Sequence, residues 1–188
     1  MQVCRSLRAV TRPDLTKDDL LRIAETDLYY EVAMLRGGLA GHEQAWELKP
    51  LQYGQDHPIR IAWAVNFEAA LLHARVLNDF LTGDPRSRRY RDDVFAGDFI
   101  PNWQPPTPGP LCRIGPEVKR NIDKQLAHLS SKRVTREDLN AHRIVTEVLS
   151  DMRTFAFDPR NVCYDALRGV RDILDRDRWQ AVRLAAGR

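Results

Sequence analysis

Residues 57–82, HPIRIAWAVNFEAALLHARVLNDFLT, constrain the fold more than any other stretch of the chain. With about 100° between successive residues of an α-helix, Glu68, Arg75 and Asp79 share one narrow strip, and apolar residues occupy most of the remaining circumference. A helix of this kind is normally covered by other helices on several sides, so the pattern predicts a long central helix. The positions expected to be inaccessible to solvent are Val65, Ala69, Leu72 and Val76.

The rest of the chain favours an all-α fold. Apolar residues recur at helical spacing over four further stretches, roughly 17–36, 116–132, 136–153 and 160–184. Thr16 to Asp19 resemble a capping box at the start of the first stretch, and Gly37-Gly38 are expected to end it. No segment has the period-two alternation of a strand. The prediction is a single-domain bundle of about five helices over residues 1–188.

Residues 83–115 interrupt this pattern, because six prolines and four glycines fall within them. A proline inside a helix removes a backbone hydrogen bond and clashes with the preceding turn. We therefore predict a long irregular loop within the bundle, most clearly over residues 101–110, with Trp103 as its anchor. Loops of this length in a compact domain are often functional.

The composition narrows the class of protein. With 29 basic and 26 acidic residues, the net charge of +3 permits a local basic patch but does not require a nucleic-acid partner. Cys4, Cys112 and Cys163 lie far apart, which indicates neither a disulfide framework nor a zinc site and favours a reducing compartment. No apolar run reaches about 18 residues, and no signal-peptide pattern is present. We expect a cytoplasmic protein without a membrane partner, a metal or a cofactor.

The polar residues most capable of chemistry lie on two of the predicted helices. They are Asn66 and His73 on the central helix, and Arg120, Asn121, Lys124 and His128 on the helix at 116–132. A histidine can transfer protons near neutral pH, and an arginine or lysine can hold the charge of a phosphate. The combination suits a phosphodiester, bound in a groove whose second wall is His73 or a second subunit. The alternative is that the histidines are hydrogen-bonded residues at the core edge and the asparagines tie helices together.

A second basic group lies in the proline-rich loop. Arg86, Arg88 and Arg89 are close together in the sequence and can follow the backbone of a nucleic acid. The alternative is that they belong to a solvated loop, which the small net charge of the chain favours.

The segment from Arg120 to His128, RNIDKQLAH, resembles the motif of the HEPN superfamily. Members are small α-helical bundles of bacterial toxin–antitoxin, abortive-infection and CRISPR systems, and many are metal-independent ribonucleases. Their motif is an arginine, often followed by a polar residue such as asparagine, with a histidine four to six residues later. Seven residues separate Arg120 from His128 here, which places them about 80° apart on an α-helix, whereas Asn121 and His128 share a face. The resemblance implies His128 as general acid/base, Arg120 or Lys124 as phosphate ligand and Asn121 as orienting residue.

Two functions remain open from the sequence. In the first, the chain cleaves RNA by attack of the RNA 2′-hydroxyl, so that no metal is needed, and dimerisation pairs two shallow sites. In the second, the chain is a non-catalytic interaction subunit of a bacterial defence or toxin–antitoxin assembly. The expected partners are RNA, a second copy of the chain or another protein. The first function requires His128 and a cationic side chain open to a common cleft, and the second expects them to be covered.

Overall fold

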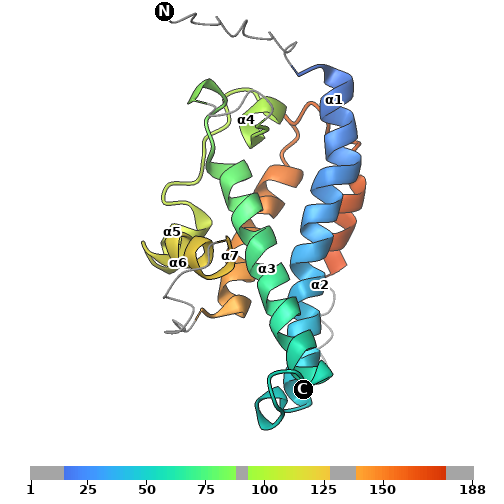
Figure 1. The fold of residues 1–188 in the computed structure, drawn as a ribbon. Coiled ribbons are helices and arrows are strands. Elements are labelled where there is room, and N and C mark those ends of the chain that lie inside the picture. Colours follow the sequence, from blue (N-terminus) through green and yellow to red (C-terminus); the bar gives the residue numbers. More distant parts are fainter. Residues whose placement is uncertain (1–14, 88–92, 128–138, 177–188) are drawn as a thin grey trace, which may run out of the picture.

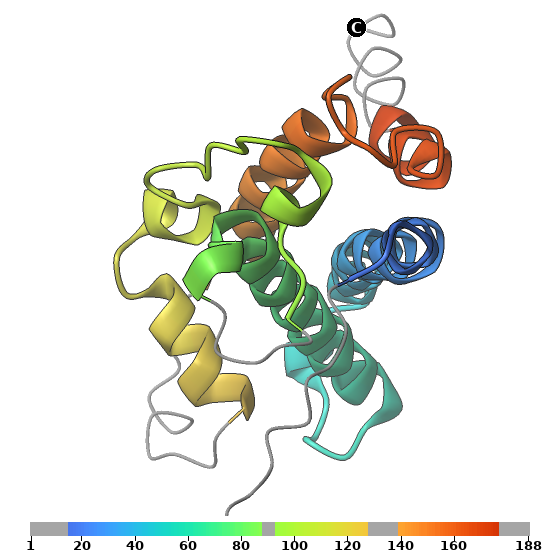
Figure 2. The same cartoon turned by 90° about the horizontal axis from the view of Figure 1, so that it is seen from above.

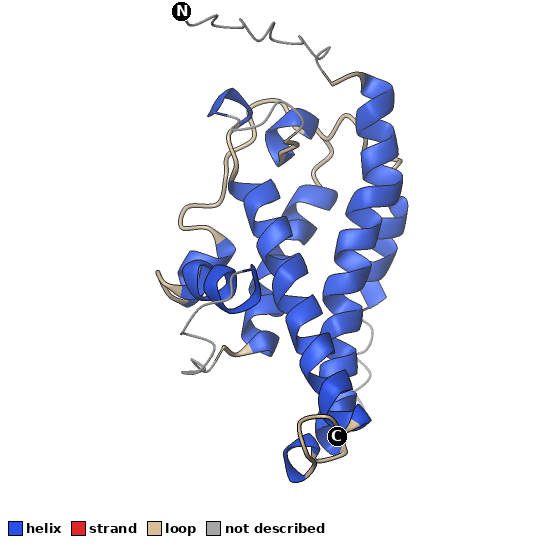
Figure 3. Ribbon diagram, in the orientation of Figure 1, coloured by secondary structure: helices blue, strands red, loops and turns tan. Residues whose placement is uncertain are grey.

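The computed structural model describes residues 15–87, 93–127 and 139–176, and these residues form an all-α fold, as predicted (Figures 1 and 3). The longest helices are α2 (Leu28–Glu47), α3 (Pro58–Thr82) and α7 (Ala141–Ala156). The short helices are α1 (Lys17–Arg22), α4 (Ala96–Phe99), α5 (Pro110–Ile114) and α6 (Val118–Ile122). Single turns are η1 (Ile23–Asp27), η2 (Pro50–Gln52), η3 (Pro85–Ser87) and η4 (Asp123–Ala127), of which η1 and η4 are π-helical. Residues 168–176 are helical as well.

The first helical run starts as predicted but does not end as predicted. Thr16 and Asp19 form the expected capping box, with the Asp19 carboxylate accepting a hydrogen bond from the Thr16 backbone N–H at 3.0 Å. From there α1, η1 and α2 continue without a break to Glu47, so the helix end expected at Gly37-Gly38 is wrong. Residues 39–47, which follow those glycines, are helical as well.

Glycines occur inside α2 because α2 and α3 cross very closely. A Cβ atom on Gly38 would lie only 2.8 Å from the backbone nitrogen of Ala70 in α3. A Cβ atom on Gly41 would lie 2.6 Å from the side-chain oxygen of Asn66. These residues therefore permit a close helix–helix approach rather than terminate a helix.

The central helix has the predicted bounds, because its end signals are local. Pro58 fixes the first turn, the His57 side chain accepts a hydrogen bond from the Ile59 backbone N–H at 3.3 Å, and Gly83 follows the last residue. α2 runs antiparallel to α3 on one side, while α7 and α6 cover two others (Figures 1 and 2).

The predicted set of inaccessible positions on α3 is wrong. Val65, Leu72 and Val76 are 57%, 43% and 41% exposed, and Ala69 is only partly buried. The residues that are buried on α3 are Ala70, Leu71, His73, Ala74, Leu77, Asn78, Phe80 and Leu81. The reason is that the described elements cover only part of the circumference of α3 and leave one apolar side exposed.

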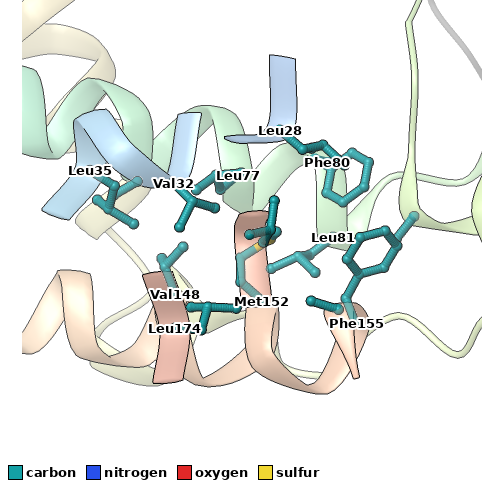
Figure 4. Close-up of a cluster of buried hydrophobic side chains, with 14 of the residues drawn as sticks. Leu28, Val32, Leu35, Leu77, Phe80, Leu81, Val148, Met152, Phe155 and Leu174 are labelled. Carbon is teal, nitrogen blue, oxygen red and sulfur yellow. The ribbon is translucent and has the colours of Figure 1, made fainter. Parts of the chain in front are cut away.

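The core lies between α2, α3, α7 and the helix at 168–176 (Figure 4). It is built from aliphatic and aromatic side chains that include Leu28, Val32, Leu35, Leu77, Leu81, Val148, Met152 and Leu174. At one end three phenylalanines meet edge to face: Phe155 lies 5.0 Å from Phe80 and 5.7 Å from Phe99, measured between ring centroids. Phe99 belongs to α4, so this contact ties the loop region to the bundle.

The prolines make residues 101–109 irregular, as predicted, although α4 and α5 provide short helices on either side. Trp103 anchors the segment, because its indole N–H donates to the Leu81 carbonyl oxygen at 3.0 Å and its ring packs edge to face on Phe155. The later helices start later than expected. α6 begins at Val118, and α7 begins at Ala141 after an Asn140 cap.

Candidate functional site

The short helix α6 is held on α3 by two ion pairs. Arg75 on α3 pairs with Asp123 at the start of η4, and the Lys119 Nζ atom lies 2.9 Å from the Asp79 Oδ1 atom. All four side chains are partly exposed, between 30% and 41%. Two residues of the charged strip on α3, Arg75 and Asp79, therefore dock α6 and η4.

The helix that carries Arg120 and Asn121 changes to π-helical geometry at Asp123, before Lys124. η4 follows α6 without a break, and a π-turn holds one more residue than an α-turn. Side chains within the turn are thus rotated from the positions expected on an uninterrupted α-helix. Single π-turns are frequent at functional sites.

The candidate residues on α6 and η4 lie in different environments. The Arg120 side chain is 57% exposed and pairs with Glu117 one turn earlier. Asn121 is buried, and Lys124 is half-buried. His128 lies outside the described residues.

His73 faces α2 instead of α6. Its Nδ1 atom lies 2.6 Å from the Glu31 Oε2 atom, Tyr30 packs edge to face on its ring, and the residue is buried. Around α3, His73 is about 160° from Arg75, the residue that holds η4. The expectation that His73 forms the second wall of a groove on this helix is therefore wrong. The pair with Glu31 gives His73 a place in the α2–α3 contact.

Asn66 also takes part in the contact between α2 and α3. Its amide nitrogen donates to the Ala62 carbonyl oxygen at 2.8 Å, one turn back in the same helix. Its side chain lies where a Cβ atom of Gly41 would be. Asn66 and His73 thus both lie in the contact between α2 and α3.

In the proline-rich loop, only Arg86 of the expected arginine group can be placed. Arg86 is exposed, and its backbone N–H and Nε–H donate to Asp84 Oδ1 at 2.9 and 3.2 Å. These bonds lower the pKa of the Asp84 carboxyl below its usual range, the backbone bond contributing most. Arg88 and Arg89 lie outside the described residues.

The feature that sequence reasoning missed is an apolar stripe on the bare side of α3. We call Ile61, Val65, Leu72 and Val76 the outer stripe. Their exposed fractions are 48%, 57%, 43% and 41%, and together they span only about 60° of the helix circumference. The signal in the sequence was the width of the apolar arc of α3. Neighbouring helices do not cover so wide an arc completely, so one apolar side remains exposed.

A second exposed group lies where α2 turns into α3. His42, Trp63 and Phe67 pack as a stack of rings, and Trp46 extends it to the surface, where it is 51% exposed. The His42 Nδ1–H donates to the Trp63 carbonyl oxygen at 3.2 Å, which fixes the ring. This cluster closes the end of the hairpin.

The described part of the chain has neither a cluster of metal-binding side chains nor a membrane-spanning helix. Over residues 15–87, 93–127 and 139–176, no group of three or more His, Cys, Asp or Glu side chains is arranged to hold a metal ion. Within the same ranges, no helix combines the length and the apolar character that crossing a bilayer requires.

Comparison of the chain with protein-family models, with curated proteins and with solved structures found no match in any of the three.

Proposed function

We propose that this chain is a non-catalytic helical interaction protein that binds a protein partner through the outer stripe of α3. The assembly is of the bacterial defence or toxin–antitoxin kind that the HEPN resemblance implies. The observation that carries the proposal is the exposure of four large aliphatic side chains along one side of one helix. Single exposed aliphatic residues are ordinary on protein surfaces, whereas four of them in line along one side of a helix form an apolar strip that a partner can cover.

The energetics favour covering this surface. Burying an aliphatic side chain fully is worth about 1.5–3 kcal/mol, and each residue of the outer stripe is still about half accessible. Four half-covered side chains therefore leave a few kcal/mol of hydrophobic stabilisation, on the order of 3–6 kcal/mol, available to a partner. That amount is offset in part by the entropy lost on association, so shape and the flanking contacts decide the affinity.

The polar residues support the same proposal. An interaction protein needs no accessible acid or base, and His73, Asn121 and Asn66 are buried or bonded within the bundle. These are the packing roles that the second sequence-based hypothesis assigned to Asn66 and His73.

The test is site-specific photo-crosslinking in living cells. A photoreactive residue at Val65 should give one discrete covalent product, whereas the same residue at Val162, which is 47% exposed on another part of the molecule, should not. A second substitution on the stripe, Leu72→Lys, should remove the product formed at position 65. Absence of a product at Val65, or an equal product at Val162, would contradict the proposal.

Metal-independent RNA cleavage is the second candidate function. It is favoured by the exposure of Arg120 on the segment that resembles the HEPN motif, next to a π-turn. In that case purified chain should cut single-stranded RNA in the presence of a chelator. Positioned acid/base catalysis contributes about 10²–10⁴-fold, so His128→Ala should remove most of the activity without changing the melting temperature. A wild-type chain that cuts nothing would exclude this candidate.

A further inference from the structure

The outer stripe is symmetric along the sequence. The intervals between Ile61, Val65, Leu72 and Val76 are four, seven and four residues, so the pattern is the same in both chain directions. Its midpoint falls between Glu68 and Ala69. An interface with two-fold symmetry requires a patch that is complementary to itself, in which residue i contacts residue j and j contacts i. The spacing of the outer stripe satisfies the second part of this requirement, because each of its positions can lie opposite its counterpart in both copies.

We propose that the partner bound by the outer stripe is a second copy of this chain, with the two α3 helices antiparallel and the two-fold axis at the Glu68–Ala69 midpoint. The inference rests on the proposed function, because it names the partner of the same surface. In this arrangement Ile61 lies opposite Val76 of the second copy, and Val65 lies opposite Leu72. Intervals of four and seven residues keep all these contacts on one seam of each helix.

Of the two residues at the midpoint, Ala69 is the one that permits a close approach of the two helices. Ala69 is small and partly exposed beside the axis, and Ala62 is exposed further along the same side. Packed helices lie about 8–10 Å apart, and the smaller distances require small side chains at the crossing point. Among the described elements α3 contacts chiefly α2 and α7, with fewer contacts to α4, α5, α6 and η2, and the stripe is exposed from Ile61 to Val76. Beyond Val76, Asp79 on the same side of α3 pairs with Lys119 of α6.

The available area sets the strength of the association. From their exposed fractions, the four side chains offer roughly 300 Å² per copy, or about 600 Å² for a pair, against the 1,200–2,000 Å² that specific interfaces bury in total. Interface cores are apolar and their rims polar, so the stripe supplies the core and its flanks supply the remainder. The dimer should therefore belong to the weaker class and dissociate on dilution.

The first experiment is sedimentation equilibrium of the full chain over a range of micromolar concentrations. Wild type should approach twice the chain mass of 21.7 kDa and fall towards the monomer on dilution. Val65→Lys should weaken association by at least about tenfold, because it places two like charges at the core of the interface. Val162→Lys, a matched valine that is equally accessible elsewhere, should leave it unchanged. Circular dichroism melting of each variant establishes that it is folded.

The second experiment fixes the direction of the helices by disulfide formation, in chains whose Cys4 and Cys112 are replaced by serine. A mixture of Ile61→Cys chains and Val76→Cys chains should form the mixed covalent dimer. Ile61→Cys chains alone should not cross-link, because the two copies of position 61 lie at opposite ends of the interface. Cross-linking of Ile61→Cys with itself indicates a parallel pair and overturns the arrangement.

These results separate the inference from the proposed function. A wild-type chain that stays monomeric at all concentrations overturns the second-copy inference, as does a dimer that Val65→Lys leaves intact. If Val65 then cross-links to a different protein in cells, the interaction function stands with another partner. If the chain stays monomeric and photo-crosslinking at Val65 gives no product in cells, both proposals fail.

Discussion

At the scale of single residues, two adjacent leucines on α3 differ in burial and therefore in their expected contribution to stability. Leu71 is fully buried in the core, whereas Leu72 is 43% exposed on the outer stripe. Leu71→Ala should lower the free energy of unfolding by about 2–5 kcal/mol, because it removes buried methyl groups and leaves a cavity. Leu72→Ala should cost less than about 1 kcal/mol in the monomer. Urea titration of both variants at concentrations where the chain is monomeric makes the comparison. Equal losses would show that α3 is covered on its outer side.

The turn after α7 contains a carboxyl group whose protonation can be followed. The Asp158 side chain accepts hydrogen bonds from the Arg160 guanidinium, at 2.6 Å for the shortest, and from the Arg160 backbone N–H at 2.9 Å. These bonds lower the pKa of Asp158 below its ordinary value of 3.8, the side-chain bond contributing most. Since the folded pKa is the lower one, the stabilisation is present at neutral pH and is lost as the pH falls below 3.8 through the folded pKa.

We therefore expect NMR titration of the Asp158 carboxyl to give a midpoint below 3.8 in the wild type and a higher midpoint in Arg160→Ala. The stability difference between the two chains should shrink over the same acid range. An identical midpoint in both chains would show that the guanidinium does not act on this carboxylate in solution.

At the scale of elements, the crossing of α2 and α3 depends on one of two adjacent glycines. A Cβ atom on Gly38 would meet the backbone of α3, at 2.8 Å from the nitrogen of Ala70, whereas a Cβ atom on Gly37 would have nothing within 4 Å. Gly38→Ala should force the helices apart and destabilise the fold by about 1–3 kcal/mol. Gly37→Ala should stabilise it by about 0.5–1 kcal/mol through higher helix propensity. Thermal unfolding of the two variants should therefore shift in opposite directions, and a shift in the same direction would contradict the close crossing.

This pair of glycines also shows which structural features could not be predicted from the sequence. The bounds of α3 could be predicted because His57, Pro58 and Gly83 act on the backbone within one turn. Gly37-Gly38 gave the same local signal as a helix end, and only the presence of α3 against Gly38 distinguishes close packing from termination. The helix class and the irregular 101–109 segment follow from local patterns, whereas contacts between distant elements do not.

The candidate site was less predictable for the same reason. The sequence placed His73 and the 116–132 helix on surfaces that could face one another, but the position of Glu31 on α2 and of Asp123 on η4 decides which side of α3 each uses. The π-turn at η4 was not visible either, since no residue type encodes it. The wide apolar arc of α3 predicted burial in general and could not show which side lacks a covering helix.

At the scale of the whole molecule, the proposed two-fold arrangement has a charge that acts against it. Glu68 is exposed and flanks the outer stripe beside the proposed axis. About a two-fold axis perpendicular to antiparallel helices, the same flank of each copy meets, so two Glu68 carboxylates approach one another.

Like charges in such positions destabilise by a few tenths of a kcal/mol at exposed sites, and salt screens the repulsion. Glu68→Gln should therefore tighten the dimer about 1.5- to twofold at low salt, and less at high salt. The matched control is Asp172→Asn, which removes one exposed negative charge from the helix at 168–176 and should leave the dissociation constant unchanged. Dilution series of the three chains by sedimentation or mass photometry give the comparison. If Glu68→Gln weakens the dimer, Glu68 pairs with a cation across the interface, and the axis cannot lie at the Glu68–Ala69 midpoint.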